Sequence, residues 1–151
     1  MAPGDASDGV RIRDARIGDA PDVALLLDAL GYPCSRDEAA DRIAMVLADP
    51  RQRLLLAEID GHACGLAAMD LRCSLVRGTE QARITALVVS PECTRQGVGR
   101  RLVREVEAIA RQSRAARIEV TTALSREHAH AFYRECGYSH GSLHFTKLLG
   151  D

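Results

Sequence analysis

The sequence predicts a mixed α/β fold of the α+β kind, in which a central sheet begins as an antiparallel meander, continues into a pair of parallel strands and is accompanied by about four helices. Two observations carry this prediction. Strand-like runs separated by short turn signals are followed by a helical pattern and one further strand-like run, as in a parallel crossover. Helical patterns also lie before and after this block. The strand-like runs are residues 53–59, 62–72, 83–89 and 117–122, and the helical patterns are 21–30, 36–47, 98–110 and 126–136.

The first two helices have local start and stop signals. A short strand is expected before them at Val10–Arg13, where apolar and basic residues alternate. Pro21 suits a first helical position, and Gly31 is placed to end that helix in a left-handed cap. Ser35–Glu38 has the form of a capping box and opens the second helix. We therefore expect two helices joined by Gly31-Tyr32-Pro33-Cys34.

The meander and the chain end are predicted from turn chemistry and alternation. Asp60-Gly61 is the two-residue turn that best matches the twist of a hairpin, and Gly78 marks the next turn. Thr85–Val89 is almost entirely apolar, which is typical of a central strand covered on both faces. The segment from Tyr138 to Leu149 is expected to supply the closing strand.

Composition indicates one folded domain. Of the 151 residues, 46% are hydrophobic and 27% charged, as in folded soluble proteins. We expect a flexible tail over residues 1–9 and a single domain over 10–151. A net charge of -1 and only five aromatic residues argue against nucleic acid as a partner. No apolar run is long enough to cross a bilayer, and the start lacks the pattern of a secretory signal, so we expect no membrane partner.

The five cysteines indicate a reducing environment. They are odd in number, scattered and free of any CxxC pair, which fits neither a disulfide framework nor a zinc site. His128 and His130 lie two apart on a predicted helix and do not share a face. We therefore predict a cytoplasmic protein without a metal.

The strongest chemical signal lies between the strand ending at Val89 and the helix beginning near Val98. Gly97 and Gly99 remove two side chains from the first helical turn, so that backbone N–H groups can approach an anion. Arginines 95, 100 and 101 oppose the helix dipole unless an anion compensates them. This favours a phosphate site, although the glycines could merely permit a tight turn beside solvated arginines. A GxxxxGK[ST] loop is absent, and Leu102 is too large for the third glycine of a dinucleotide fingerprint.

The run Ile84–Pro91, continued by Thr94-Arg95-Gln96-Gly97-Val98-Gly99-Arg100, resembles the acetyl-CoA signature of the GCN5-related N-acetyltransferase (GNAT) superfamily. The order of predicted elements is similar along nearly the whole chain. Within the superfamily, Arg126–Lys147 most resembles small-amine enzymes related to aminoalkylphosphonate acetyltransferase. The resemblance implies an acyl-CoA N-acyltransferase type of fold, with a splayed parallel strand pair, and an enzyme with acetyl-CoA as co-substrate and no metal.

The resemblance also implies roles for particular residues. Leu87, Val88 and Val89 would offer backbone groups to the pantetheine arm and the acetyl carbonyl. Tyr133 matches the tyrosine that faces the cofactor sulfur, although its place beside Phe132 on an apolar helix face would also suit a core residue. The pyrophosphate would be held by Arg95, Gln96, Gly97, Val98, Gly99 and Arg100. Thr94 and Arg83 depart from the pattern, and Arg83 stands where histone-modifying members carry a catalytic glutamate.

The implied reaction is direct attack of a neutral primary amine on the thioester. Tyr133 could protonate the departing thiolate, because a phenol is a donor near pKa ~10. The general base is left open among Glu119, Glu80 and Asp70, with Glu119 ranked first, although acidic residues in strands are more often paired or solvated.

The acceptor is expected to be a small-molecule amine, bound near the first two helices with their 31–34 connection and near the loop from Arg72 to Glu80. Arg72 and Arg77 could hold an acidic group there. A protein amino-group acetyltransferase, a non-catalytic acyl-CoA-binding module and a nicotinamide-binding protein are the alternatives. We also allow for a homodimer.

Overall fold

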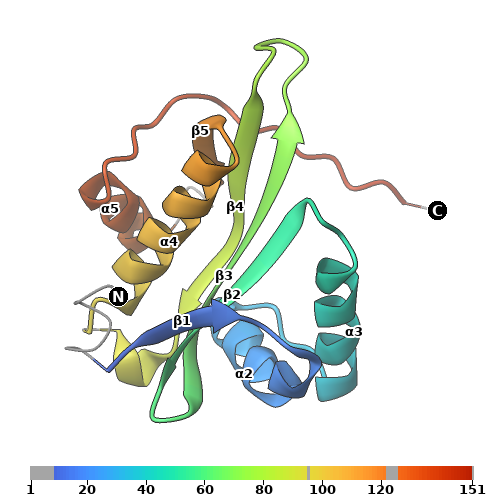
Figure 1. The fold of residues 1–151 in the computed structure, drawn as a ribbon, viewed down its shortest axis with the longest axis vertical. Helices are drawn as coiled ribbons and strands as arrows, with labels where there is room; N and C mark the ends of the chain where they lie inside the picture. The colour runs from blue at the N-terminus through green and yellow to red at the C-terminus, as the bar shows by residue number, and fades with distance from the viewer. Residues whose placement is uncertain (1–8, 95, 122–125, 151) are drawn as a thin grey trace. The chain divides into compact units, whose positions relative to one another are not determined.

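In a computed structural model of the protein, the residues described are 9–94, 96–121 and 126–150 (Figure 1). Two compact units are present, Met1–Val120 and Thr121–Asp151. Of the expected N-terminal tail, residues 1–8 lie outside the described residues. The single domain expected over residues 10–151 stays a prediction.

The first unit contains a five-stranded sheet in the order β1-β2-β3-β4-β5. Strands β1 to β4 pair antiparallel in chain order, and β5 pairs parallel to β4. This confirms the mixed sheet and its antiparallel meander. The strands are β1 (Arg11–Asp14), β2 (Gln52–Ile59), β3 (His62–Cys73), β4 (Glu80–Val89) and β5 (Ala115–Val120).

Helices cover both faces of this sheet, with α2 and α3 on one face and α4 on the other (Figure 1). Consecutive residues of β3 show the division, because Leu66 packs in a cluster with Val23 and Ile43, whereas a Cβ atom on Gly65 would meet Val98. The helices of the first unit are α2 (Ala20–Leu30), α3 (Arg36–Leu47) and α4 (Val98–Gln112), with 3-10 turns η1 (Ile17–Asp19) and η2 (Pro91–Cys93).

The local signals act as expected. Gly31 ends α2 with φ 105° and donates its N–H to the Asp28 carbonyl at 3.0 Å. Ser35 and Glu38 form the reciprocal capping box of α3, with N–H···O distances of 3.1 and 2.9 Å. Asp60 and Gly61 both have positive φ, 52° and 81°, as a type I′ hairpin turn requires. These short-range interactions fix where the elements begin and end.

One expectation about β4 is wrong. Ala68 of β3 lies opposite Ala86, whereas Met69 lies opposite Ile84, so Thr85 is an extra residue that forms a β-bulge. Thr85 is exposed and the four residues after it are only half-buried. Thr85–Val89 is therefore not covered on both faces, because the bulge bends β4 and its pairing with β5 ends at Ile84.

The second unit contains α5 (Glu127–Glu135), in which Tyr133 is the buried residue. The expected closing strand over Tyr138–Leu149 is not formed, and no regular element is present over these residues. The large apolar side chains of this segment are exposed, Leu143 at 80% and Phe145 at 87%. The reason is the lack of a partner, because a strand is stable only when its backbone groups pair, and no described strand pairs with this segment.

Two negative findings hold for the described ranges. No helix there is long and apolar enough to span a membrane. No group of three or more His, Cys, Asp or Glu side chains within those ranges gathers so that it could hold a metal ion.

Candidate active site

The second half of β4 has one paired and one open edge. On the β3 side its register continues to Val89, which lies opposite Gly65. On the β5 side, pairing ends at Ile84 opposite Val120, and no described strand pairs with the edge beyond. Such an edge presents backbone N–H and C=O groups to a ligand beside it. The segment on the open edge includes the predicted cofactor residues Leu87, Val88 and Val89.

The start of α4 is arranged to receive an anion. Gly97 precedes the helix with φ 73°, a left-handed conformation that glycine adopts without strain. No side chain caps this end, and its first turn holds no acidic residue, so the N–H groups of Val98–Arg100 and the positive end of the helix dipole face outward. Gln96 and Arg100 are exposed beside them. Arg95, the remaining predicted phosphate ligand, lies outside the described residues.

Packing holds the helix start against the end of β4. Gly65, the register neighbour of Val89, lies so close to α4 that an added Cβ atom would be 3.0 Å from Val98 Cγ1. Arg101 donates from Nη1 to the Val10 carbonyl at 3.0 Å, which ties α4 to the segment before β1. The open strand edge and the uncapped helix start are therefore parts of one packed unit.

Two of the three candidate general bases flank Arg83. Asp70 and Glu119 are its register neighbours on β3 and β5, so all three side chains share one face of the sheet. Asp70 Oδ2 accepts from Arg83 Nη2 at 2.8 Å, whereas Glu119 lies 3.7 Å from Arg117 Nε. Leu87 lies four positions after Arg83, roughly 13 Å along an extended strand. Glu119 is thus the less engaged carboxylate, and it is too far from Leu87 for direct contact.

The third candidate, Glu80, has structural partners. Arg51 Nη2 lies 2.6 Å from its Oε2, and the Cys73 Sγ lies 3.2 Å from its Oε1. The hydrogen bond from Arg51, followed by that from Cys73, lowers the pKa of Glu80. A carboxylate with a lowered pKa is a weaker proton acceptor at neutral pH. The structure therefore argues against Glu80 as a base.

Tyr133 belongs to the second unit, and the residue is 9% exposed. It makes edge-on ring contacts with Phe132 and Tyr138, at centroid distances of 5.2 and 5.6 Å. Burial, reinforced by Cys136, raises the pKa of Tyr133 to about 12. The hydroxyl is therefore protonated at neutral pH, as a proton donor must be. Its role at the cofactor sulfur stays a prediction.

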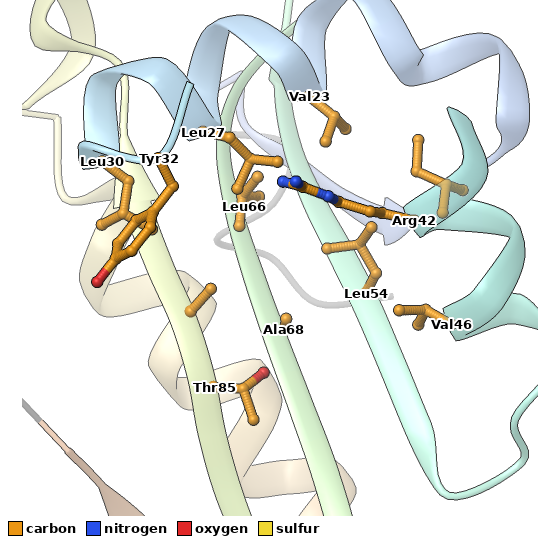
Figure 2. Close-up of a pocket in the computed structure, with 12 residues that line it drawn as sticks. Val23, Leu27, Leu30, Tyr32, Arg42, Val46, Leu54, Leu66, Ala68 and Thr85 are labelled. Atoms are coloured by element: carbon orange, nitrogen blue, oxygen red, sulfur yellow. The ribbon is translucent and has the colours of Figure 1, made fainter. Parts of the chain in front are cut away.

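A pocket of about 360 Å³ opens in the first unit, on the sheet face that carries α2 and α3 (Figure 2). Its walls are mostly apolar, and they extend to Thr85 and Ala86 at the bulge, immediately before Leu87. Tyr32 lines the pocket as the 31–34 connection suggested, but Arg72 and Arg77 do not. The lining residues are Val23, Leu27, Leu30, Tyr32, Arg42, Ile43, Val46, Leu54, Leu66, Ala68, Thr85 and Ala86.

Sequence reasoning missed Arg42, the charged residue of this lining. A signal was present, because Arg42 lies three residues after Ala39 and four before Val46, two members of the apolar face of α3. At helical spacing these positions lie on one side. An arginine within an apolar stripe marks a place where a charge faces other elements of the fold.

Comparisons with known proteins give consistent matches. A sequence model of the acetyltransferase (GNAT) family matches residues 23–138. The aminoalkylphosphonate N-acetyltransferase of Salmonella typhimurium is 33% identical over 125 residues, which cover 83% of this chain and 79% of the relative. The aminoglycoside N(6′)-acetyltransferase type 1 of Stenotrophomonas maltophilia is 32% identical over 131 residues, 84% of each chain.

A solved structure is also similar. The GNAT family acetyltransferase of Staphylococcus aureus matches with a TM-score of 0.81 at 23% identity, over 93% of this chain and 99% of that one. At this identity the structural match concerns the fold alone. It agrees with the mixed sheet and four helices described above.

Proposed function

Because the chain belongs to the acetyltransferase (GNAT) family and is an N-acetyltransferase, we propose that it transfers the acetyl group of acetyl-CoA to the primary amine of a small molecule. The observation that carries this proposal is the junction of β4 and α4. The open edge of Thr85–Val89 leads directly to the uncapped start of α4. Acetyl-CoA combines an amide-containing arm with a pyrophosphate. The open strand edge suits the arm, and the uncapped helix start suits the pyrophosphate.

The cofactor residues follow from this arrangement. Leu87, Val88 and Val89 bind the pantetheine arm through their backbone groups, as a neighbouring strand would. Residues 96–100, with Arg95, hold the pyrophosphate through N–H groups and arginine side chains. The absence of an acidic residue from the first turn of α4 supports this role, because a carboxylate there would repel the phosphates.

In the reaction, the amine nitrogen forms a bond to the thioester carbonyl carbon, the C–S bond breaks, and the thiolate leaves. The alkylammonium, near pKa ~10, first loses one proton, and the nitrogen loses a second proton as the amide forms. Tyr133, whose raised pKa keeps the hydroxyl protonated at neutral pH, donates a proton to the thiolate. The second proton from nitrogen restores the Tyr133 hydroxyl, so that one proton is released overall. Glu119 accepts the first proton through water, since roughly 13 Å separates its register position from Leu87.

A small molecule is favoured as acceptor by the pocket beside the bulge. Its volume of about 360 Å³ lies in the range of small-molecule sites, and it adjoins the β4 segment proposed to hold the thioester. The two curated relatives are named for small amines, an aminoalkylphosphonate and an aminoglycoside. A protein lysine would instead need an open groove for its flanking chain.

A screen of primary amines with acetyl-CoA, detecting the released thiol, tests the reaction. Thermal shifts test the cofactor separately, because a ligand that binds the folded state raises the melting temperature. We expect stabilisation by CoA and acetyl-CoA and none by NAD or NADP. Stabilisation by NAD alone would refute the cofactor assignment, whereas acetyl-CoA binding without turnover of any amine would indicate a non-catalytic module.

Two further predictions stay as proposals, a cytoplasmic location and a homodimer. Light scattering coupled to gel filtration measures the mass of the particle against the 16.4 kDa of one chain. A mass of one chain at all concentrations would contradict the dimer.

A further inference from the structure

We propose that Arg42 selects the acceptor, and that the preferred substrate is an amine with an apolar body and one oxyanionic group, a carboxylate or a phosphonate. This inference rests on the proposed function, since it names the substrate class of the same site. The apolar walls of the pocket would surround the apolar body of such a substrate. What remains is to account for the guanidinium in its wall.

Arg42 is the charged member of the described residues that line the pocket. Figure 2 shows its side chain extending from α3 into the space between Val23, Leu54 and Leu66. All three of these neighbours are aliphatic, and none can accept a hydrogen bond. The guanidinium carries five N–H donors beside this apolar space. Because Arg42 is exposed, water can satisfy these donors, and a bound oxyanion would replace that water with a charged acceptor.

Other arginines of this unit have such acceptors within the protein. Arg13, Arg53 and Arg83 each contact a carboxylate at 2.7 to 2.9 Å. Arg42 makes no hydrogen bond or ion pair with any described residue. Its closest acidic influence is Glu38, one turn earlier on α3, whose pKa Arg42 helps to lower.

The side chain of Glu38 already accepts a hydrogen bond in the N-terminal cap of α3. Its Oε1 accepts the N–H of Ser35 at 2.9 Å, and that hydrogen bond is the largest cause of its lowered pKa. The guanidinium of Arg42 is therefore available for a ligand. Arginine binds carboxylates and phosphonates through two parallel N–H···O bonds, which also fixes their orientation.

The geometry of the pocket gives the acceptor a direction. Figure 2 shows Arg42 and Thr85 on opposite sides of Ala68. With its oxyanion at Arg42, an amine of extended form lays its apolar chain over Leu66 and Ala68 and points its nitrogen toward Thr85, next to the segment proposed to hold the thioester. A polycationic amine is disfavoured, because one of its charges would meet the guanidinium.

The test compares four amines of equal chain length: an ω-aminoalkanoate, an ω-aminoalkylphosphonate, an alkylamine without a second charge, and an α,ω-diamine. Their kcat/KM values are measured with the native protein, Arg42→Gln and Arg36→Gln. Arg36 is the matched control, because it is an exposed arginine at the start of the same helix and does not line the pocket. Melting temperatures verify that the variants fold.

We expect the native protein to prefer an oxyanionic amine over the alkylamine by about tenfold or more, as a charged hydrogen-bonded contact allows. Arg42→Gln should bring that preference to within about twofold, mainly through KM, whereas Arg36→Gln should preserve it. The better of the two oxyanions identifies the headgroup. Equal turnover of all four amines, or a preference that survives Arg42→Gln, would overturn the role of Arg42 while leaving the acetyltransferase reaction intact.

Calorimetric binding of the same amines gives an answer that does not depend on turnover. If no amine is acetylated, the proposed reaction fails. Even so, Arg42-dependent binding of the oxyanionic amines would support the selection, and binding unchanged by Arg42→Gln would refute it. Arg42→Glu should reverse the preference toward the diamine.

Discussion

Replacing Gly65 with alanine tests the contact that holds α4 against the sheet. The added Cβ atom would lie 3.0 Å from Val98 Cγ1, 3.1 Å from Leu102 Cδ1 and 3.3 Å from the Val88 carbonyl oxygen. Favourable carbon contacts are about 3.5 to 4.0 Å, so the side chains of α4 or the helix itself must give by a few tenths of an ångström. Overpacking of this kind costs about 1 to 3 kcal/mol.

A smaller term opposes that cost. Alanine restricts the unfolded chain more than glycine and stabilises by about 0.4 to 1 kcal/mol where the backbone permits it, and Gly65 has no positive φ. The net loss in the free energy of unfolding is then between roughly 0 and 2.6 kcal/mol. For a chain of this size each kcal/mol lowers the melting temperature by about 2 to 4 °C. Acetyl-CoA affinity should also fall, because Val98 begins the helix proposed to hold the pyrophosphate.

Denaturant titration and calorimetry measure the two effects. Gly18→Ala is the control, since a Cβ atom there meets nothing within 4 Å. Val98→Ala removes the closest contact, so it should relieve part of the Gly65→Ala cost, giving a favourable coupling in a double-mutant cycle. A cycle without coupling between Gly65→Ala and Val98→Ala would refute the close-packing argument.

Three further predictions concern the proposed site. Gly99→Asp should weaken acetyl-CoA binding at least about tenfold in calorimetry while the fold survives, because a carboxylate would face the pyrophosphate; unchanged affinity would contradict the phosphate site. Tyr133→Phe keeps the ring and removes the hydroxyl, so kcat should fall on the order of 10² to 10⁴ with acetyl-CoA affinity nearly unchanged, whereas an enzyme within about twofold of native activity would exclude the acid. The pKa of Tyr133, raised by burial to about 12, means that the folded state holds this proton more tightly than the unfolded state, so the free energy of unfolding should fall as pH rises from about 10 to 12, by about 1 to 3 kcal/mol. Tyr133→Phe should lack that decline. The difference in phenolate absorbance between the native protein and Tyr133→Phe should titrate near pH 12. A midpoint near 10 would show that Tyr133 is not desolvated.

Features set by neighbours in sequence were predictable. The Gly31 cap, the capping box of Ser35 and Glu38, and the Asp60-Gly61 turn each depend on hydrogen bonds within a few residues. The burial of α4 followed from its strong amphipathic pattern. The junction of β4 and α4 could be proposed as the cofactor site because glycine and helix-dipole chemistry are local.

Features set by distant pairing were not predictable from local pattern. The bulge at Thr85 depends on how Ala68 and Met69 of β3 meet β4, and nothing in the run Thr85–Val89 signals it. The apolar segment after Tyr138 resembles a strand by alternation, yet strand formation requires a partner that periodicity cannot reveal. The same holds for the pocket, whose lining comes from two helices and three strands.

The bulged strand β4 lies where two separate stretches of the sequence meet, one proposed to bind the cofactor and one that lines the acceptor pocket. The segment proposed to handle the cofactor is one continuous stretch, Thr85–Arg100, whereas most of the pocket wall that faces an acceptor comes from residues 23–46, nearly forty positions earlier. The two stretches meet where Thr85 and Ala86 enter the pocket, and Val88 packs against the core cluster that includes Val23 and Ile43. We therefore expect that exchanging the helical pair between relatives would change the choice of amine more than it would change the binding of acetyl-CoA.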